Sequence, residues 1–215
     1  MTAAEPGEGA VALPQVRAAA TVVVWRAGRS GRTEVLMGQR GAQAVFMPSK
    51  YVFPGGAVDP GDDALAHPLP LAPRCVARLG LRLPEGAPGA AALAGAAVRE
   101  LVEETGLVLR CDGASTALRF VFRAITPPGR SRRFDARFFL ADAARVAGDP
   151  DDFAAASDEL SHLHWIGLAE ARALDLPFIT EVVLAEVTAL LSGEPDHGVP
   201  FFDNSGPVPT FRRLD

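Results

Sequence analysis

The sequence predicts an α/β sandwich built on a mixed β-sheet. Apolar segments rich in β-branched and aromatic residues, typical of strands, are interspersed with Ala- and Leu-rich segments that have a helical period. Tight turns join some strands into hairpins, while helices separate others, which favours a sheet of mixed strand directions. The chain has 215 residues, of which 48% are hydrophobic, and this is enough for one substantial core.

The N-terminal part is predicted to form a hairpin followed by a loop rich in turns. AATVVVW (19–25) and TEVLMGQR (33–40) are predicted strands, and GRSGR lies in the turn between them. The Pro- and Gly-rich segment 46–63 then surrounds one short extended piece, YVF. Residues 64–89 contain five prolines around a short predicted helix at 72–79. This composition indicates an inserted excursion outside the core.

The Ala-rich segment 91–104 is predicted to be a helix. It ends before Gly106, because glycine readily takes the positive φ of the residue that follows a helix. Glu100, Glu103 and Glu104 are three and four residues apart, so each Cβ lies within about 5–6 Å of a neighbour. The helical period places these acids opposite an apolar face formed by Ala91, Ala94, Val98, Leu101 and Val102.

The three acids are unfavourably placed unless a cation binds them. Like charges one turn apart repel, and the C-terminal end of a helix carries a partial negative charge. Carboxylate oxygens suit a hard divalent cation, Mg²⁺ or Mn²⁺, which would convert the repulsion into coordination. A solvated acidic face is the alternative interpretation. In the turn FPGGAVDPGDD, Gly55 and Gly56 allow close backbone approach to a ligand, which favours the metal if the turn packs beside the helix.

The C-terminal half is predicted to contain three strands and two helices. Strands at 117–126 and 134–141 are joined by PPGRSRR, and a short strand covers 163–166. Two helical segments follow, at 167–174 and 180–191.

We expect a single domain over residues 18–192, with residues 64–89 as an insertion within it. Residues 1–17 are predicted to be a flexible lead. The Pro- and Gly-rich residues 193–215 are predicted to be a tail that packs on the domain surface.

Composition excludes several classes of protein. The formal net charge of −5 argues against a sequence-independent nucleic-acid binder, which needs clustered excess Lys and Arg. Cys75 and Cys111 do not have the spacing of a disulfide framework or a thiolate zinc site. No apolar run approaches the roughly 20 residues of a membrane span. The first residues lack a signal-peptide pattern, so we expect a cytoplasmic protein with no membrane partner.

The acidic helix and the glycine turn together resemble the Nudix hydrolase family. That family carries a box of the form G-x5-E-x7-R-E-U-x-E-E-x-G-U, where U is a bulky aliphatic residue. Gly56 matches the first position, and Asp62 stands where the family usually has Glu. The second half of the box matches throughout, at Arg99, Glu100, Leu101, Glu103, Glu104, Gly106 and Leu107.

The spacing between the two halves departs from the usual box. Residues 63–98, which number 36, separate them in place of the usual seven. This inserted box resembles a Nudix subgroup that includes the peroxisomal coenzyme A diphosphatases. FMPSKYVFPGG before the box, ITPPGRSRRFDARFFLA after it and DELSHLHWIGLAEA later in the chain extend the similarity over roughly residues 18–190.

The resemblance implies a Nudix-type α/β/α sandwich and a Mg²⁺- or Mn²⁺-dependent site. Carried over by position, Glu100, Glu103 and Glu104 would be metal ligands, together with a backbone carbonyl at Gly55 or Gly56. Arg99 would pair with a glutamate of the box and fix its orientation. Glu104 and Glu159 are the two candidates for the general base, and the sequence does not rank them.

An arginine cluster follows in GRSRRFDAR. We expect Arg130, Arg133 and Arg137 to bind substrate phosphates, because the arginine fork matches phosphate oxygens. Strand alternation makes Arg133 and Arg137 the preferred pair. A solvated hairpin rim with Arg–Asp135 ion pairs is the alternative.

The resemblance also implies the reaction, which is hydrolysis of the diphosphate linkage in a nucleoside diphosphate joined to a group X. Subgroup similarity favours coenzyme A or acyl-CoA, while nucleotide sugars, ADP-ribose and dinucleoside polyphosphates stay open. Two other functions are considered: a ligand-sensing Nudix domain without catalysis, and an RNA-end-processing enzyme, which the net charge disfavours. The sequence does not decide whether the protein is a monomer or a homodimer. In a homodimer, residues 64–89 are one candidate for the contact between the two subunits.

Overall fold

A computed structural model describes residues 14–28, 31–65, 71–110 and 117–215. Within these ranges the strands form one nine-stranded mixed sheet in the order β3-β2-β1-β6-β5-β8-β9, with β4 also pairing β1 and β7 pairing β2. The strands are β1 (Val16–Ala27), β2 (Thr33–Arg40), β3 (Tyr51–Val52), β4 (Gly55–Ala57), β5 (Arg119–Ile125), β6 (Arg133–Asp142), β7 (Leu160–Gly167), β8 (Val199–Asp203) and β9 (Thr210–Leu214). The helices are α1 (Asp62–Leu65), α2 (Pro73–Leu79), α3 (Ala90–Thr105), α4 (Leu168–Ala171), α5 (Phe178–Leu191) and the 3₁₀ turn η1 (Ala143–Arg145).

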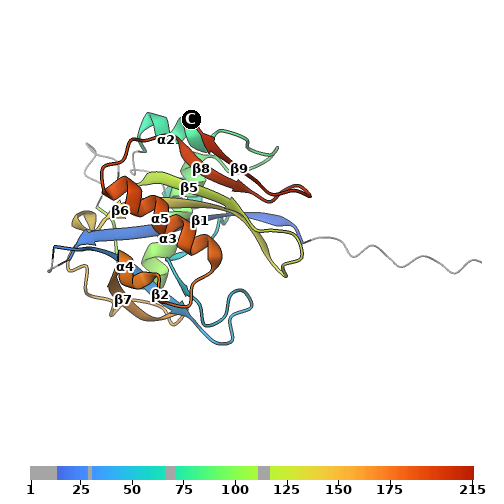
Figure 1. Ribbon diagram of the computed structural model, residues 1–215. Helices are drawn as coiled ribbons and strands as arrows, with labels where there is room; N and C mark the ends of the chain where they lie inside the picture. The colour runs from blue at the N-terminus through green and yellow to red at the C-terminus, as the bar shows by residue number, and fades with distance from the viewer. Residues whose placement is uncertain (1–13, 29–30, 66–70, 111–116) are drawn as a thin grey trace, which may run out of the picture.

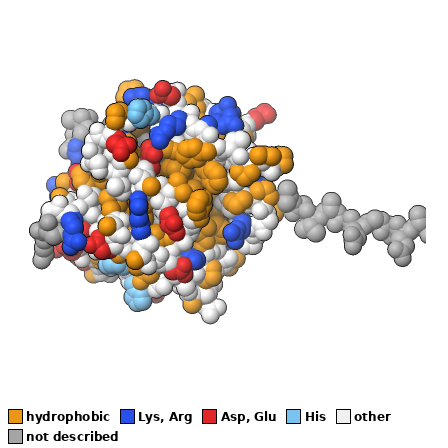
Figure 2. All heavy atoms as spheres, viewed as in Figure 1, with side chains coloured by type: hydrophobic (Ala, Val, Ile, Leu, Met, Phe, Trp, Pro, Cys, Tyr) orange, Lys and Arg blue, Asp and Glu red, His pale blue; other side chains and the backbone are white. Residues whose placement is uncertain are grey.

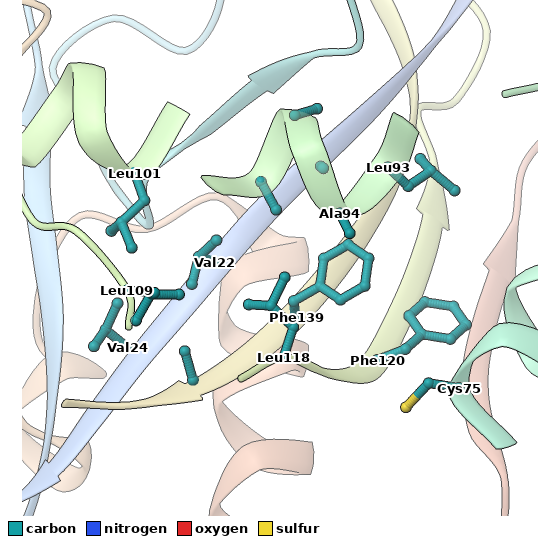
Figure 3. Close-up of a cluster of buried hydrophobic side chains, with 14 of the residues drawn as sticks. Val22, Val24, Cys75, Leu93, Ala94, Leu101, Leu109, Leu118, Phe120 and Phe139 are labelled. Carbon is teal, nitrogen blue, oxygen red and sulfur yellow. The ribbon is translucent and has the colours of Figure 1, made fainter. Parts of the chain in front are cut away.

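The helices α3 and α5 cover opposite faces of the sheet (Figure 1). On one face, Leu93 and Leu101 of α3 pack in a cluster with Val22 and Phe139 of the strands (Figure 3). The other face carries a second buried cluster, in which α5 contributes Val183, Leu184 and Val187. The predicted α/β/α sandwich with a mixed sheet is therefore confirmed. No helix in the described part of the chain has the length and apolar character of a membrane crossing.

The long strand β1 positions the glycine turn. One edge of β1 pairs in parallel with β6, from Val16 to Trp25. Its other edge is divided, since β2 pairs with the C-terminal end and β4 pairs with residues 19–21. This division places Gly55 and Gly56 beside the middle of the sheet, on strand β4 and next to α3.

The inserted segment is part of the core, which corrects its prediction as an excursion outside it. Cys75 and Leu79 lie four residues apart on α2 and are buried with the α3 cluster. One turn of helix brings side chains at this spacing onto one face, and that face packs against β5. Residues 66–70 of the segment lie outside the described residues.

The C-terminal segment, predicted to be a surface tail, instead extends the sheet by two strands. β8 pairs in parallel with β5, and β9 pairs antiparallel with β8. Val199 and Phe201 are buried in the core, and the Pro and Gly residues around them obscure the strand in the sequence. At the other end, β1 begins at Val16, inside the predicted lead of residues 1–17, of which 1–13 lie outside the described residues.

Gly95 allows α1 to pack directly on α3. A Cβ added at this position would lie 1.7 Å from the backbone oxygen of Asp62. We expect Gly95→Ala to lower the free energy of unfolding by about 1–3 kcal/mol, because α1 must move away. Chemical denaturation measures the change, and Gly206→Ala is the matched control because its Cβ would meet no atom within 4 Å. A more stable Gly95→Ala protein, as expected from helix propensity alone, would contradict this packing.

Candidate active site

The two halves of the split motif meet in the structure. The backbone N–H of Gly55 donates a hydrogen bond of 2.7 Å to Oε2 of Glu104, across 49 residues of sequence. The helix α3 ends at Gly106, which has the positive φ of 75° expected of a glycine after a helix. The glycine turn and the acidic end of α3 therefore form one site.

Glu104 is buried against the glycine turn. Its exposure is 1%, and its Oε1 has no hydrogen-bond partner among the described residues. Burial raises the pKa of Glu104 to about 8; the Gly55 amide opposes this rise, whereas Glu100 and Glu159 add to it. The alternative interpretation of a solvated acidic face is therefore wrong for Glu104, because β4 packs along α3 and gives the helix a second buried side.

Glu100 lies against Gly56. A Cβ at Gly56 would stand 2.3 Å from Glu100 Oε1, so this close approach requires a glycine. Burial raises the pKa of Glu100, although Arg99 opposes the rise. Glu103 differs, since its side chain is 56% exposed and pairs with Arg99 at 3.0 Å. The three carboxylates therefore form a series from buried to open.

Arg99 holds this arrangement together. Its Nε donates to Asp62 at 2.8 Å, and its Nη1 donates to Glu100 at 2.8 Å and to Glu103 at 3.0 Å. Its Nη2 donates to the carbonyl of Ala57 at 2.9 Å. Hydrogen bonding to Asp62 raises the pKa of Arg99 above its ordinary value. Arg99 therefore pairs with two glutamates of the box. It also donates to Asp62, which occupies the position where the family usually has Glu.

Glu159 joins the same group from a distant part of the sequence. The N–H of Ser157 donates to the carbonyl of Glu103 at 3.0 Å, which ties the preceding loop to the end of α3. Glu159 is exposed, and its charge contributes to the raised pKa values of Glu100 and Glu104. We name Glu100, Glu103, Glu104 and Glu159 the carboxylate cluster. Both candidates for the general base belong to it.

Arg40 is a site residue that the sequence interpretation missed. It ends β2, and its Nη2 donates to Glu159 at 3.1 Å. Its Nε is buried without a partner among the described residues. No local sequence pattern marks this arginine, because its position depends on the pairing of β2 with β7. That pairing sets Arg40 opposite Leu160, the residue after Glu159.

The three arginines predicted to bind phosphate occupy different environments. Arg130 is exposed in the turn between β5 and β6. Arg133 is buried and donates to the backbone carbonyls of Thr126 and Asn204, each at 3.0 Å. Arg137 is also buried, with its Nη1 3.0 Å from Oδ2 of Asp135. Arg133 therefore braces the backbone through these two carbonyls.

The residues at the carboxylate cluster fit a hard divalent cation. Among the described residues, no three acidic, histidine or cysteine side chains converge closely enough to hold an ion by themselves. Mg²⁺ commonly needs only one or two protein carboxylates, since water and substrate phosphates supply its other ligands. The unpartnered Oε1 of Glu104 provides an oxygen donor of this kind.

Comparisons with known proteins agree with this geometry. Residues 79–187 match the NUDIX domain family model. A NUDIX hydrolase from Alicyclobacillus acidocaldarius is 28% identical, with a TM-score of 0.61 over 83% of this chain and 93% of that one.

Two more distant structures share the fold. The Ap4A hydrolase of C. elegans in a binary complex is 21% identical, covering 83% of this chain and 99% of that chain, with a TM-score of 0.52. The NUDIX domain of Shewanella oneidensis NrtR, complexed with ADP ribose, is 14% identical, covering 82% and 89%, with a TM-score of 0.54. The chain belongs to the NUDIX domain family and is a hydrolase of diphosphate linkages.

Proposed function

We propose that the protein is a Mg²⁺- or Mn²⁺-dependent hydrolase that cleaves the diphosphate linkage of a nucleoside diphosphate joined to a group X. The observation that carries this proposal is Glu104, which is buried against the Gly55 amide with one carboxylate oxygen unpartnered. A buried acid without a partner is costly in a fold, and a cation relieves that cost. The resulting site is suited to a substrate that carries negative charge.

The residues that would hold the cation are Glu100, Glu103 and Glu104, with a backbone carbonyl of Gly56. When bound, the ion neutralises the charge of the diphosphate and lowers the pKa of a water molecule. Arg99 positions Glu100 and Glu103 by its two hydrogen bonds from Nη1. Arg40 has a guanidinium fork beside Glu159 that is suited to a phosphate oxygen.

The proton of the attacking water goes to a carboxylate of the cluster, Glu104 or Glu159. In the metal-free protein burial raises the pKa of Glu104 to about 8, so once it is deprotonated this carboxylate is a stronger base than an ordinary glutamate. Glu159 is exposed and is held by Arg40 at 3.1 Å, so its release from this ion pair would make it available.

For X we propose coenzyme A or acyl-CoA, and the support is the resemblance of the inserted box to coenzyme A diphosphatases. ADP-ribose and nucleotide sugars are the alternative substrates within the same reaction. A ligand-sensing domain without catalysis is less well supported, because Glu100, Glu103 and Glu104 are all retained and Arg99 positions two of them.

A substrate panel tests the proposal. The purified protein is incubated with coenzyme A, acetyl-CoA, ADP-ribose, a nucleotide sugar and Ap4A in Mg²⁺ or in EDTA, and both products are identified by mass. We expect at least one member of the panel to be cleaved at its diphosphate linkage, in Mg²⁺ but not in EDTA. Tight binding of a panel member without turnover would instead support the sensing domain. Capped RNA is assayed separately, and phosphate release from it with no panel member cleaved would support RNA processing.

The stability of the metal-free protein is expected to fall as pH rises toward 8. Glu104 has a pKa of about 8 in the folded protein against an ordinary value of 4.5. Between these two values the native state holds a proton that the unfolded chain has released, so raising the pH favours unfolding. Metal binding requires the deprotonated acid, so Mg²⁺ should raise Tm more at about pH 9 than at about pH 6.

Thermal unfolding in EDTA and in Mg²⁺ at several pH values measures both effects. Glu104→Gln should remove much of the pH dependence. A metal-free protein whose Tm rises steadily from pH 5 to about pH 8 would contradict the assignment.

A further inference from the structure

A second site lies outside the carboxylate cluster, in a cavity of about 1,210 Å³. The inserted segment 82–89 forms one wall, the start of β1 and the N-terminal end of α3 form others, and β8 closes the far side. None of its lining residues belongs to the carboxylate cluster. A cavity of this size is ample for an organic ligand.

The cavity has a buried cationic floor made by Arg123, Asp135 and Arg137. Arg123 donates to both carboxylate oxygens of Asp135, at 2.8 and 2.7 Å, so this pair is neutral as a unit. Arg137 adds a second cation, with its Nη1 bonded to the carbonyl of Asp135 at 2.8 Å. Its Nε and Nη2 are buried and have no partner among the described residues. The floor therefore carries one net positive charge and two unmet donors.

Arg137 remains charged near neutral pH. Burial lowers the pKa of Arg137 to about 10, although Asp135 opposes this effect. Leaving donors of a buried cation unsatisfied is costly, so an anion against Arg137 would be favoured. The acids Asp59, Asp63 and Glu85 also line the cavity, but their side chains are exposed, so water screens their charge; a fourth acid, Asp203, is half-buried.

The remaining lining combines apolar side chains with polar and charged ones. Val58, Ala92 and Phe201 face the cavity, and the Phe201 ring lies 4.3 Å from the Arg123 guanidinium. Nη1 of Arg123 also donates to the carbonyls of Leu81 and Arg82, which fixes the start of the inserted wall. The cavity thus combines a buried cationic floor with apolar side chains on its walls.

We propose that this cavity binds an amphiphilic organic anion, with a carboxylate or phosphate head against Arg137 and an apolar body along Val58, Ala92 and Phe201. This inference does not depend on the proposed function, because it uses none of the residues of the carboxylate cluster. It gives the inserted segment and β8 a shared role as the walls of a ligand site.

Calorimetric titration in EDTA tests this proposal without turnover, with octanoate, octyl phosphate and octanol as probes. At least one of the two anions should bind, and the better of them identifies the head group. Octanol should bind about tenfold or more weakly, because it lacks the charge that Arg137 would meet. Failure of both anions to bind, or equal affinity for octanol, would overturn the proposal.

Three variants locate the binding. Ala92→Phe fills the cavity and should weaken octanoate or octyl phosphate binding about tenfold or more. Phe211→Ala is the control, because Phe211 is exposed and is not among the residues that line the cavity. Phe211 instead contacts Phe202, which contacts Phe178 of α5, and an apolar patch is visible beside α5 in Figure 2. That control should bind normally. Arg137→Met, checked for folding by circular dichroism, should bind the anions no more tightly than octanol. Unchanged anion binding in Ala92→Phe would overturn the placement of the ligand in this cavity.

Discussion

Glu104→Gln is expected to lower kcat by about 10²–10⁴-fold on the substrate that the panel identifies. The amide keeps the size of the side chain but removes its negative charge and its capacity to accept a proton. Glu104 is the buried member of the carboxylate cluster, held by the Gly55 amide at 2.7 Å, so no other side chain can replace it in that position. Steady-state kinetics in saturating Mg²⁺ measures the loss.

A glutamate far from the site provides the matched control. Glu181 is exposed on α5, and Glu181→Gln should keep wild-type kcat. Glu159→Gln separates the two candidate bases: loss of the acidic limb of the kcat profile in one variant only assigns the base to that residue. Wild-type activity in Glu104→Gln would exclude the carboxylate cluster as the catalytic site.

Arg99→Met is expected to lower the free energy of unfolding by about 3 kcal/mol and activity by about 10–100-fold. Methionine fills much of the volume of arginine but cannot donate hydrogen bonds. Asp62 would be left buried and charged, and Glu100 and Glu103 would lose the group that orients them. Urea denaturation and steady-state kinetics measure the two effects separately.

The double variant distinguishes the two roles of Arg99. Adding Asp62→Asn to Arg99→Met removes the unpaired charge, so stability should partly return while activity stays low. Arg74→Met is the control for stability, since Arg74 pairs with Asp215 on the surface and such pairs contribute about 0–1 kcal/mol. Equal losses of stability in Arg99→Met and Arg74→Met would contradict the role of Arg99 as the hub of the site.

Much of the carboxylate cluster was predictable because its signal is local. Three acids within one helical turn and a glycine pair are visible in the sequence, and only their contact had to come from the fold. The burial of Glu104 was not predictable from a helical period, which recognises a single apolar face. In the structure α3 has two packed sides, because β4 lies along the acidic one.

The features that the sequence did not predict depend on contacts between distant segments. Arg40 reaches Glu159 through the pairing of β2 with β7, which are separated by more than a hundred residues. β8 and β9 are short, and their Pro and Gly neighbours resemble those of a loop. Arg133 was expected to bind phosphate, yet it donates to two backbone carbonyls, because its side chain points into the fold.

The most direct measurement of the central claim is a Mn²⁺ titration followed by electron paramagnetic resonance, in which free Mn²⁺ gives the signal. The wild-type protein should bind Mn²⁺ saturably without substrate. The double variant Glu103→Gln/Glu104→Gln should bind about tenfold or more weakly, because two of the proposed carboxylate ligands are lost. Identical titration curves for the two proteins would contradict a metal site at the end of α3.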